Sequence, residues 1–429
     1  MAGHQKAWWR AFGSITLAGV AILASSEDLA AQNLDAPSES IWTRQTLLGD
    51  AGGVRENLAK AGIDVNFWIT QTYGSVLAGD ATSDGQYGAK ATLTGNVDLG
   101  KLGAWSGLSL NVILEQQAGN DTNGIDGALL PANGIMAFPR VGGYDHDVSL
   151  TVSQRFNDTF SVSAGKFNLL HLVSKTPIVG GAAEETFLNA AMAGPITGVI
   201  PPYLLGAIAN INTDHANYTV MVFDPRNAQD WDVIEKPFAD GVNAVLSATV
   251  PLTINGLPGY YGLRGVYSSQ EGIDLSRLPE IAELPQQSEN PLTRSSRWYV
   301  NASVQQYLYQ DPNRPGNGWG LFGYAAIADG NPNAIRWTAY GGLAGNSVLP
   351  GRESDKWGIG YFRYGLSSDL KDGLSALNLD IADEQGVEAF YNLHLTPWFQ
   401  VTADVQWIDT FNPAADDDWL GTLRVRTVF

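Results

Sequence analysis

The side chains best suited to catalysis in this sequence are four histidines beyond residue 31: His146, His171, His215 and His394. Each would need a nucleophile on a common face to act as a general base. The chain has no G-x-S-x-G or H-E-x-x-H motif and no cysteine, which removes thiolate nucleophiles and Cys-based metal sites. An enzyme built on a β-barrel, such as a lipase or protease, is one hypothesis for the function of this chain. We interpret the histidines as structural and predict no enzyme and no cofactor.

Charged and apolar residues alternate in the last ten positions, 420–429. One face holds Leu423, Val425, Thr427 and Phe429, and the other holds Arg424, Arg426 and Val428. Period-2 alternation predicts a β-strand between two environments. A soluble core would leave inward arginines desolvated, whereas the inner face of a membrane barrel borders water and its outer face borders lipid. The final Phe429 resembles the terminal signal by which outer-membrane barrels are recognised for assembly.

Composition supports an all-β protein. A net charge of −19 and a pI near 4.5 argue against nucleic acid as a partner, because phosphate recognition needs clustered Lys and Arg. Only 16% of the residues are charged, while there are 48 glycines, 13 tryptophans and 16 tyrosines. Such a chain is poor in helix-surface residues and rich in strand, turn and interface residues.

Three regions follow one another along the chain. Residues 1–31 have a basic start and an apolar stretch from Ala11 to Ala24, which predicts a secretory signal peptide rather than a membrane anchor. Residues 32–63 form an N-terminal segment with one short helix over 50–63, capped by Asp50. Residues 64–429 form the barrel domain.

This domain contains about sixteen stretches long enough for tilted membrane strands. They are 64–74, 89–99, 107–117, 147–156, 159–166, 203–212, 216–224, 241–250, 260–270, 297–308, 318–329, 335–345, 355–367, 385–396, 399–408 and 420–429. Long connections alternate with short ones, which is typical of outer-membrane barrels with their short turns in the periplasm. A soluble propeller or sandwich is the alternative, but no propeller-like repeat is present. The pattern predicts a transmembrane antiparallel β-barrel of about 16 strands, with the short helix at its periplasmic mouth.

Several motifs resemble the carbohydrate-selective porin (OprB) family over most of the chain. The stretch from Leu48 to Arg55, followed by Leu58 and 62–64, is similar to the family's opening motif, with Ala51 in place of the usual Trp. Further matches are Gly165-Lys166-Phe167, 185–189, Leu349-Pro350-Gly351-Arg352 with Asp355, and a closing hairpin from Glu388 to Gln406, in which Ala403 replaces a more usual Pro.

The resemblance implies a porin in the outer membrane of a Gram-negative bacterium, which lets mono- and small oligosaccharides diffuse passively into the periplasm. Its implied partners are permeating sugars, outer-membrane lipid and lipopolysaccharide, and the barrel-assembly machinery that reads the C-terminal strand. The family implies a monomer. The alternative is a general small-solute or ion-selective porin.

A sugar pore needs hydrogen-bonding groups and flat aromatic rings at its waist. Alternation places candidates on the inner face: Arg155, Arg264, Arg336, Arg424, Arg426, Glu115, Glu388, Asp404, Trp68, Tyr299, Tyr340 and Phe390. If Ile408 pairs with Leu420, Asp404 faces Arg424 and the two could form a dipole in the constriction. The alternative is that such pairs only neutralise charge within the wall.

The connection from Asn168 to Pro202 is too long for an ordinary loop. We predict that it enters the lumen as a constriction loop, with a loop packed at the rim as the alternative. Its candidate functional residues are Lys175, Glu184, Glu185 and Asn189.

Overall fold

Sixteen antiparallel strands close into one barrel in the part of the chain that the computed structural model describes, residues 40–79, 84–125, 127–194, 198–284, 292–314 and 316–429. The expected signal peptide lies outside these residues. The order around the barrel is β1-β18-β17-β16-β15-β14-β13-β12-β9-β8-β7-β6-β5-β4-β3-β2, so each barrel strand pairs with its sequence neighbours and β1 closes on β18. The predicted all-β barrel is confirmed.

All sixteen predicted strands are present, most of them with ends moved by one to four residues. The barrel strands are β1 (Ile63–Ala78), β2 (Gln86–Asp98), β3 (Leu108–Gly119), β4 (His146–Arg155), β5 (Phe160–Asn168), β6 (Tyr203–Asn212), β7 (Asn217–Phe223), β8 (Asn243–Ile254), β9 (Leu257–Ser268), β12 (Arg297–Gln310), β13 (Gly318–Ala328), β14 (Ile335–Asn346), β15 (Lys356–Leu366), β16 (Glu384–Thr396), β17 (Phe399–Asp409) and β18 (Asp418–Val428). The predicted and observed bounds of β6 coincide.

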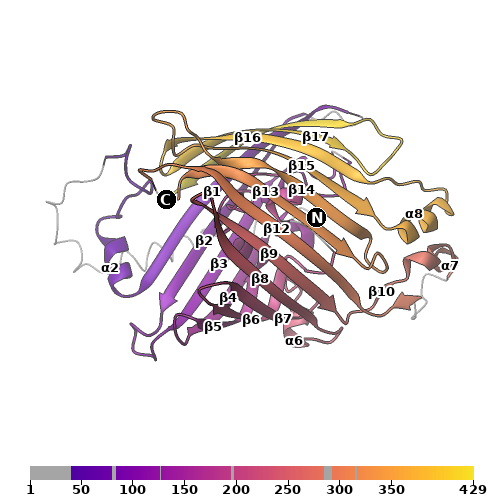
Figure 1. The fold of residues 1–429 in the computed structure, drawn as a ribbon, viewed down its shortest axis with the longest axis horizontal. Coiled ribbons are helices and arrows are strands. Elements are labelled where there is room, and N and C mark those ends of the chain that lie inside the picture. The colour runs from indigo at the N-terminus through magenta and orange to yellow at the C-terminus, as the bar shows by residue number, and fades with distance from the viewer. Residues whose placement is uncertain (1–39, 80–83, 126, 195–197, 285–291, 315) are drawn as a thin grey trace, which may run out of the picture.

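The two rims of the barrel differ in the length of their connections. One rim has short turns such as 156–159, 255–256 and 397–398, and the helix α2 (Val54–Lys60) and the C-terminus lie beside it. The other rim has the longer connections, with the small elements β10 (Gly272–Ile273), β11 (Thr293–Arg294), α6 (Trp231–Glu235), α7 (Leu278–Glu283) and α8 (Ser368–Ser375) (Figure 1). We call these the short-turn rim and the long-loop rim.

The N-terminal segment is anchored at the short-turn rim. Arg55 of α2 donates hydrogen bonds to the backbone oxygens of Val65 and Phe429, and the Leu47 N–H donates to Val428 O at 2.8 Å. The helix is shorter than predicted, because Gly53 rather than Asp50 stands at its N-cap. Asp50 instead accepts a hydrogen bond from the Glu56 N–H at 2.9 Å.

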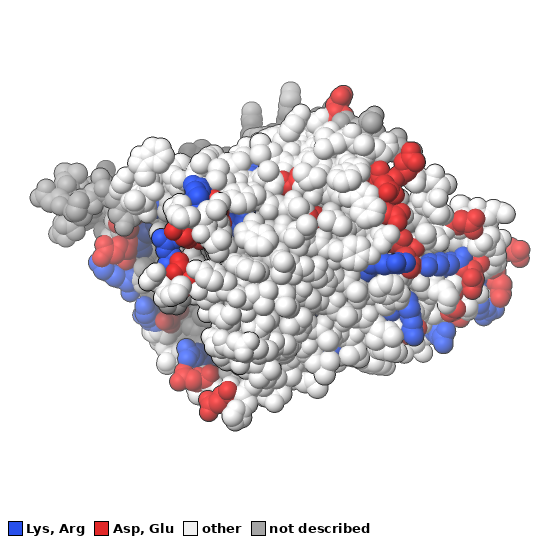
Figure 2. All heavy atoms as spheres, turned by 45° about the horizontal axis from the view of Figure 1, so that its top comes forward, with Lys and Arg blue, Asp and Glu red and all other residues white. Residues whose placement is uncertain are grey.

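The outer surface carries an apolar belt between two charged rims. Outward residues such as Leu150, Leu246 and Leu263 are about half exposed although they are apolar. Figure 2 shows Lys, Arg, Asp and Glu gathered towards both ends of the molecule, with a broad uncharged band between them. This distribution is typical of a barrel wall that faces lipid. Among the described residues, no helix is long and apolar enough to cross a bilayer.

The predicted register of the last two strands is wrong by two residues. Ile408 pairs with Asp418 rather than with Leu420, so Asp404 lies opposite Thr422 and Arg424 lies opposite Thr402. A slip of two residues keeps every side chain on its face, whereas a slip of one would turn the apolar set inward. Alternation therefore predicted the faces correctly and left the pairing along the strand open.

Candidate functional site

The connection 168–202, which we call the inner segment, folds into the lumen. It contains two short helices, α4 (Leu169–Val173) and α5 (Ala190–Ala193). Glu184 binds Lys90 on β2, while the Ile178 N–H donates to Gln305 on β12 at 2.7 Å. Because β2 and β12 stand eight places apart in the ring of sixteen strands, the inner segment crosses the barrel from wall to wall.

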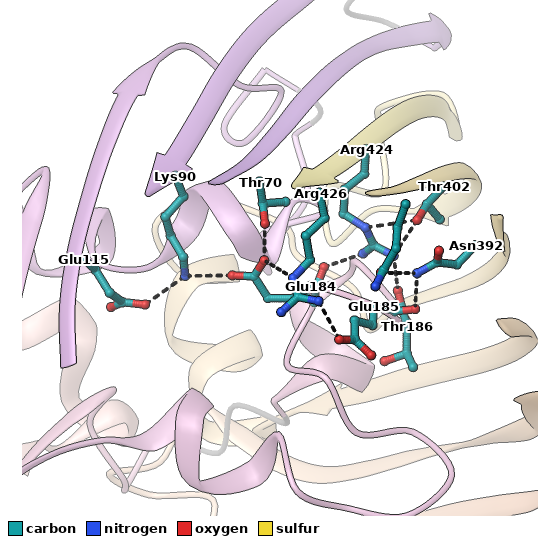
Figure 3. A network of polar contacts seen from close by, with 12 residues as sticks. Thr70, Lys90, Glu115, Glu184, Glu185, Thr186, Asn392, Thr402, Arg424 and Arg426 are labelled. Atoms are coloured by element: carbon teal, nitrogen blue, oxygen red, sulfur yellow. Dashed lines mark hydrogen bonds and ion pairs between the residues drawn. The ribbon is translucent and has the colours of Figure 1, made fainter. Parts of the chain in front are cut away.

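Two adjacent carboxylates attach the inner segment to the β1–β2–β18 side of the lumen (Figure 3). Glu184 accepts a hydrogen bond from Thr70 and lies 3.7 Å from Lys90. Glu185 accepts from Arg426 at 2.7 Å and from Lys356, on β15, at 2.5 Å. Glu184 therefore binds β1 and β2, and Glu185 joins β18 to β15.

The ion pairs of Glu185 determine its pKa. Burial alone would raise the pKa of this carboxyl, but the charges of Lys356 and Arg426 outweigh burial and lower the pKa from 4.5 to about 2. A carboxyl with a lowered pKa stabilises the folded arrangement fully above its ordinary pKa. That contribution is lost as the pH falls from 4.5 towards 2.

We therefore expect the inner segment to stay fixed between about pH 7 and pH 5 and to loosen below about pH 4. Single-channel recording at stepped pH measures this as current noise that rises only in the acid range. The Glu185→Gln variant should be noisy already at neutral pH, whereas Glu283→Gln, on the exposed helix α7, should behave as wild type. Equal noise in wild type and Glu185→Gln at pH 7 would contradict the role of this pair.

The residues that follow the Glu184–Glu185 pair in the inner segment contact the strands β15 and β16. The buried carboxylate of Glu388 accepts hydrogen bonds from the backbone N–H groups of Leu188 and Asn189. The Phe187 ring packs against Phe390, with centroids 4.9 Å apart. Gly358 makes room for these rings, because a Cβ there would lie 2.9 Å from Phe187 and 2.5 Å from Phe390.

Arg424 also holds the inner segment, and it does not pair with Asp404 as predicted. It is 1% exposed and donates to the backbone oxygens of Ala183 and Thr186 and to the Thr402 hydroxyl at 3.1 Å. Asp404 is buried too and accepts from Gln406 at 2.9 Å. The predicted facing of the two side chains is therefore wrong, and the inner segment covers Arg424.

A second connection, residues 120–139, enters the lumen beside the inner segment, and sequence reasoning missed it. The N–H groups of Leu129 and Leu130 donate to Glu384 on β16, and Gln406 on β17 donates to Ala132 O at 2.9 Å. The two connections bond to each other, because the Gly134 N–H donates to Leu188 O at 2.8 Å. Only its length, between the predicted strands 107–117 and 147–156, could have pointed to it.

Two adjoining cavities remain beside these segments. One has a volume of about 300 Å³ and the other about 680 Å³. Trp68, Asn168, His171 and Arg426 line both. The larger cavity reaches towards the short-turn rim along Asp64, Asn66 and Val428, at the ends of β1 and β18. The cavities are thus continuous with the lumen on that side.

The remaining predicted residues lie at several heights of the wall. Arg155 is at a short turn, where it pairs with Asp158 and its side chain is 66% exposed. Arg336 donates to Ala328 O near the long-loop rim, and Tyr299 is buried. Tyr340 stacks on Tyr324 with centroids 4.9 Å apart. Arg264 lies opposite Asn301 in the register. These residues do not join the network around Glu184 and Glu185.

Three lysines complete the site and were absent from the predicted set. Lys90 is buried and lies 2.9 Å from Glu115, Lys166 lies 2.5 Å from Asp147, and Lys356 binds Glu185. The alternation of Lys90 with Thr92 and Thr94 in β2 could have placed Lys90 on the inner face. Its acidic partner Glu115 lies on the neighbouring strand β3, whereas Glu184 comes from a distant part of the chain and leaves no local signal.

Comparison with known proteins agrees with this architecture. The porin described as "Putative porin QuiX", from Acinetobacter baylyi, is 23% identical over 480 aligned positions, which cover 98% of this chain and all of that one. The high-pH structure of Pseudomonas putida OprB superposes with a TM-score of 0.78 at 21% identity, covering 91% of this chain and all of that chain. Its low-pH structure gives a TM-score of 0.54 at 16% identity, covering 90% and 99%.

The sequence profile described as "Carbohydrate-selective porin, OprB family" matches residues 82–429, which is most of the chain and all strands from β2 to β18. The motifs that resemble this family, from Gly165 to Gln406, lie within the match. The short-turn rim, with α2 and the C-terminus, is accordingly the periplasmic rim. The chain belongs to the carbohydrate-selective porin family OprB, whose members let sugars cross the outer membrane passively.

Proposed function

We propose that sugars cross this barrel through the two adjoining cavities and that the inner segment, 168–202, is the constriction. The observation that carries this proposal is the attachment of the segment to opposite walls, at Lys90 and at Gln305. A segment that is attached to opposite walls narrows the lumen to the space that remains beside the segment. Mono- and small oligosaccharides are the solutes that such a passage would admit.

The chemistry of the cavities supports a hydroxylated solute. The Trp68 indole offers a flat face to the C–H side of a sugar ring. Asn66, Asn96, Asn111 and Thr151 line the larger cavity with amide and hydroxyl groups that can exchange hydrogen bonds with sugar hydroxyls. The carboxylates of Glu115, Glu184 and Glu185 all have cationic partners, which disfavours a channel selective for cations.

Planar-bilayer recording tests the proposal. Single channels in KCl should show a current that falls in steps or in mean amplitude as glucose is added, because a bound sugar occupies the space through which ions pass. Trp68→Ala should require a higher glucose concentration for half-block. Trp105→Ala, on an exposed periplasmic turn, is the matched control. Channels indifferent to glucose would favour the general or ion-selective porin.

We also propose that residues 1–31 direct export, that β18 with its final Phe429 is read by the barrel-assembly machinery, and that the porin works as a monomer. The first proposal rests on the basic and apolar stretches of the leader, and the second on the period-2 pattern of β18. N-terminal sequencing of the mature protein tests whether residues 1–31 are removed on export. The mass of the protein in detergent tests whether it is a monomer. Assembly of a Phe429→Ser variant tests the second.

A further inference from the structure

The junction between the two cavities contains hydrogen-bond donors that have no acceptor among the described residues. The Trp68 Nε1 and the Arg426 Nε are both buried atoms without a hydrogen-bond partner. The Arg426 guanidinium lies 5.2 Å from the centre of the Trp68 ring, and both side chains line both cavities. The Arg426 Nε is 3.9 Å from Glu184, which is beyond hydrogen-bond distance. Two donors therefore meet at one place without an acceptor.

A positive charge lines the larger of the two cavities. Lys175, on the inner segment, is exposed and lines the larger cavity. No described carboxylate lies within ion-pair distance of it, whereas Lys166, which lines the same cavity, is paired with Asp147 at 2.5 Å. The Lys175 ammonium is thus free to pair with a charge on a solute.

The carboxylates of Glu115 and Glu185, which line the smaller cavity, already accept hydrogen bonds. The Glu115 carboxylate accepts from Lys90, Asn168 and Tyr203 at 2.9, 2.8 and 2.7 Å. Glu185 accepts from Lys356 and Arg426. Because a buried donor without an acceptor is destabilising, a solute that brings acceptors gains more here than one that brings donors.

We propose that Trp68 and Arg426 at this junction, together with Lys175 in the larger cavity, form a subsite for the carboxylate of an acidic sugar or polyhydroxy acid. The inference rests on the proposed function and names a solute class for the same passage. A carboxylate supplies acceptors only, with a negative charge, which matches the two free N–H groups and the ammonium. The hydroxyls of a neutral sugar also bring donors, and the nearby carboxylates have their hydrogen bonds filled.

Competition between D-gluconate and D-glucose as blockers of single-channel current tests the subsite. Hydrogen bonds to an ionised group are about twice as strong as neutral ones. We therefore expect half-block by gluconate at a concentration about tenfold lower than by glucose at 0.1 M KCl. The difference should shrink at 1 M KCl, where the screening length falls from about 10 to about 3 Å.

Two variants remove single parts of the subsite. Trp68→Phe removes the indole N–H and keeps an aromatic ring, and Lys175→Gln removes the free charge from an exposed position. Each should reduce the preference for gluconate over glucose by about threefold, and the double variant should nearly abolish it. Lys101→Gln removes an exposed charge from the periplasmic turn 99–107 and should leave both blocking concentrations unchanged.

The outcomes separate this inference from the proposed function. If glucose blocks wild-type channels and gluconate blocks no better, the subsite is refuted while the sugar passage stands. A gluconate preference that persists in the double variant would also refute the subsite. If neither solute blocks, the sugar passage itself is wrong. Heat-modifiable gel mobility shows whether each variant has a folded barrel.

Discussion

Deleting residues 178–194 and joining the ends with a short Gly-Ser linker is expected to raise single-channel conductance severalfold. The deletion removes Glu184, Glu185 and Phe187, which contact the wall at β2, β15 and β16 and occupy the lumen there. Wall groups that they cover, such as Glu388 and Lys90, would then border water and could be hydrated. Ion flow would no longer be limited to the two adjoining cavities.

The deletion should also abolish block by glucose, because the narrow passage that holds the solute disappears. Deleting α7, none of whose residues is buried, is the matched control on the long-loop rim and should leave conductance unchanged. Heat-modifiable mobility must show that both deletion variants are folded. Wild-type conductance in a folded 178–194 deletion would place the inner segment outside the path of the ions.

The fold could be predicted almost completely because barrel strands carry their information locally. Alternation in single strands such as β3 and β17, together with the lengths of the connections, predicted sixteen strands and their faces. The register of β17 and β18 could not be predicted in the same way, since a slip of two residues preserves the alternation. The register depends on the conformation of the connection 410–417. The length of this connection does not determine which residues of the two strands pair.

The site was predictable as a set of inward residues and not as a set of contacts. Arg424, Arg426, Glu115, Glu388 and Asp404 all lie on the inner face, as their parity in the strands requires. The partners of Arg424, Arg426 and Glu388 come from a connection that folds back into the lumen, and these contacts span up to about half of the chain. Arg424 was interpreted as a pore residue because alternation distinguishes inside from outside and carries no information on what covers the inside.

Lys175 differs from the other cations of the lumen because it lies on the inner segment and not on a strand. Lys90, Lys356 and Arg426 project from strands towards carboxylates of the inner segment or the wall, and those ion pairs fix the segment. Lys175 projects from the segment itself into the larger cavity. Structural pairing thus consumes the charges of Lys90, Lys356 and Arg426, whereas Lys175 carries a charge that strand alternation does not address.

Arg424→Ala is expected to destabilise the seating of the inner segment by about 1–3 kcal/mol for each buried acceptor that loses its donor. The change leaves the backbone oxygens of Ala183 and Thr186 without their donor in a buried place, together with the Thr402 hydroxyl. Arg424→Lys should recover only part of the loss, because an ammonium cannot reproduce the fork of the guanidinium.

Two measurements follow the inner segment in the Arg424 variants. Protease cleavage within 168–202 should speed up in Arg424→Ala while the barrel resists, and single-channel current should become noisy, because the segment samples positions away from the wall. Arg155→Ala is the matched control, since its exposed pair with Asp158 is worth little. If Arg424→Ala shows the cleavage and current of wild type, the contacts of Glu184, Glu185 and Glu388 suffice to hold the segment. Arg424 would then only balance the buried charge of the wall.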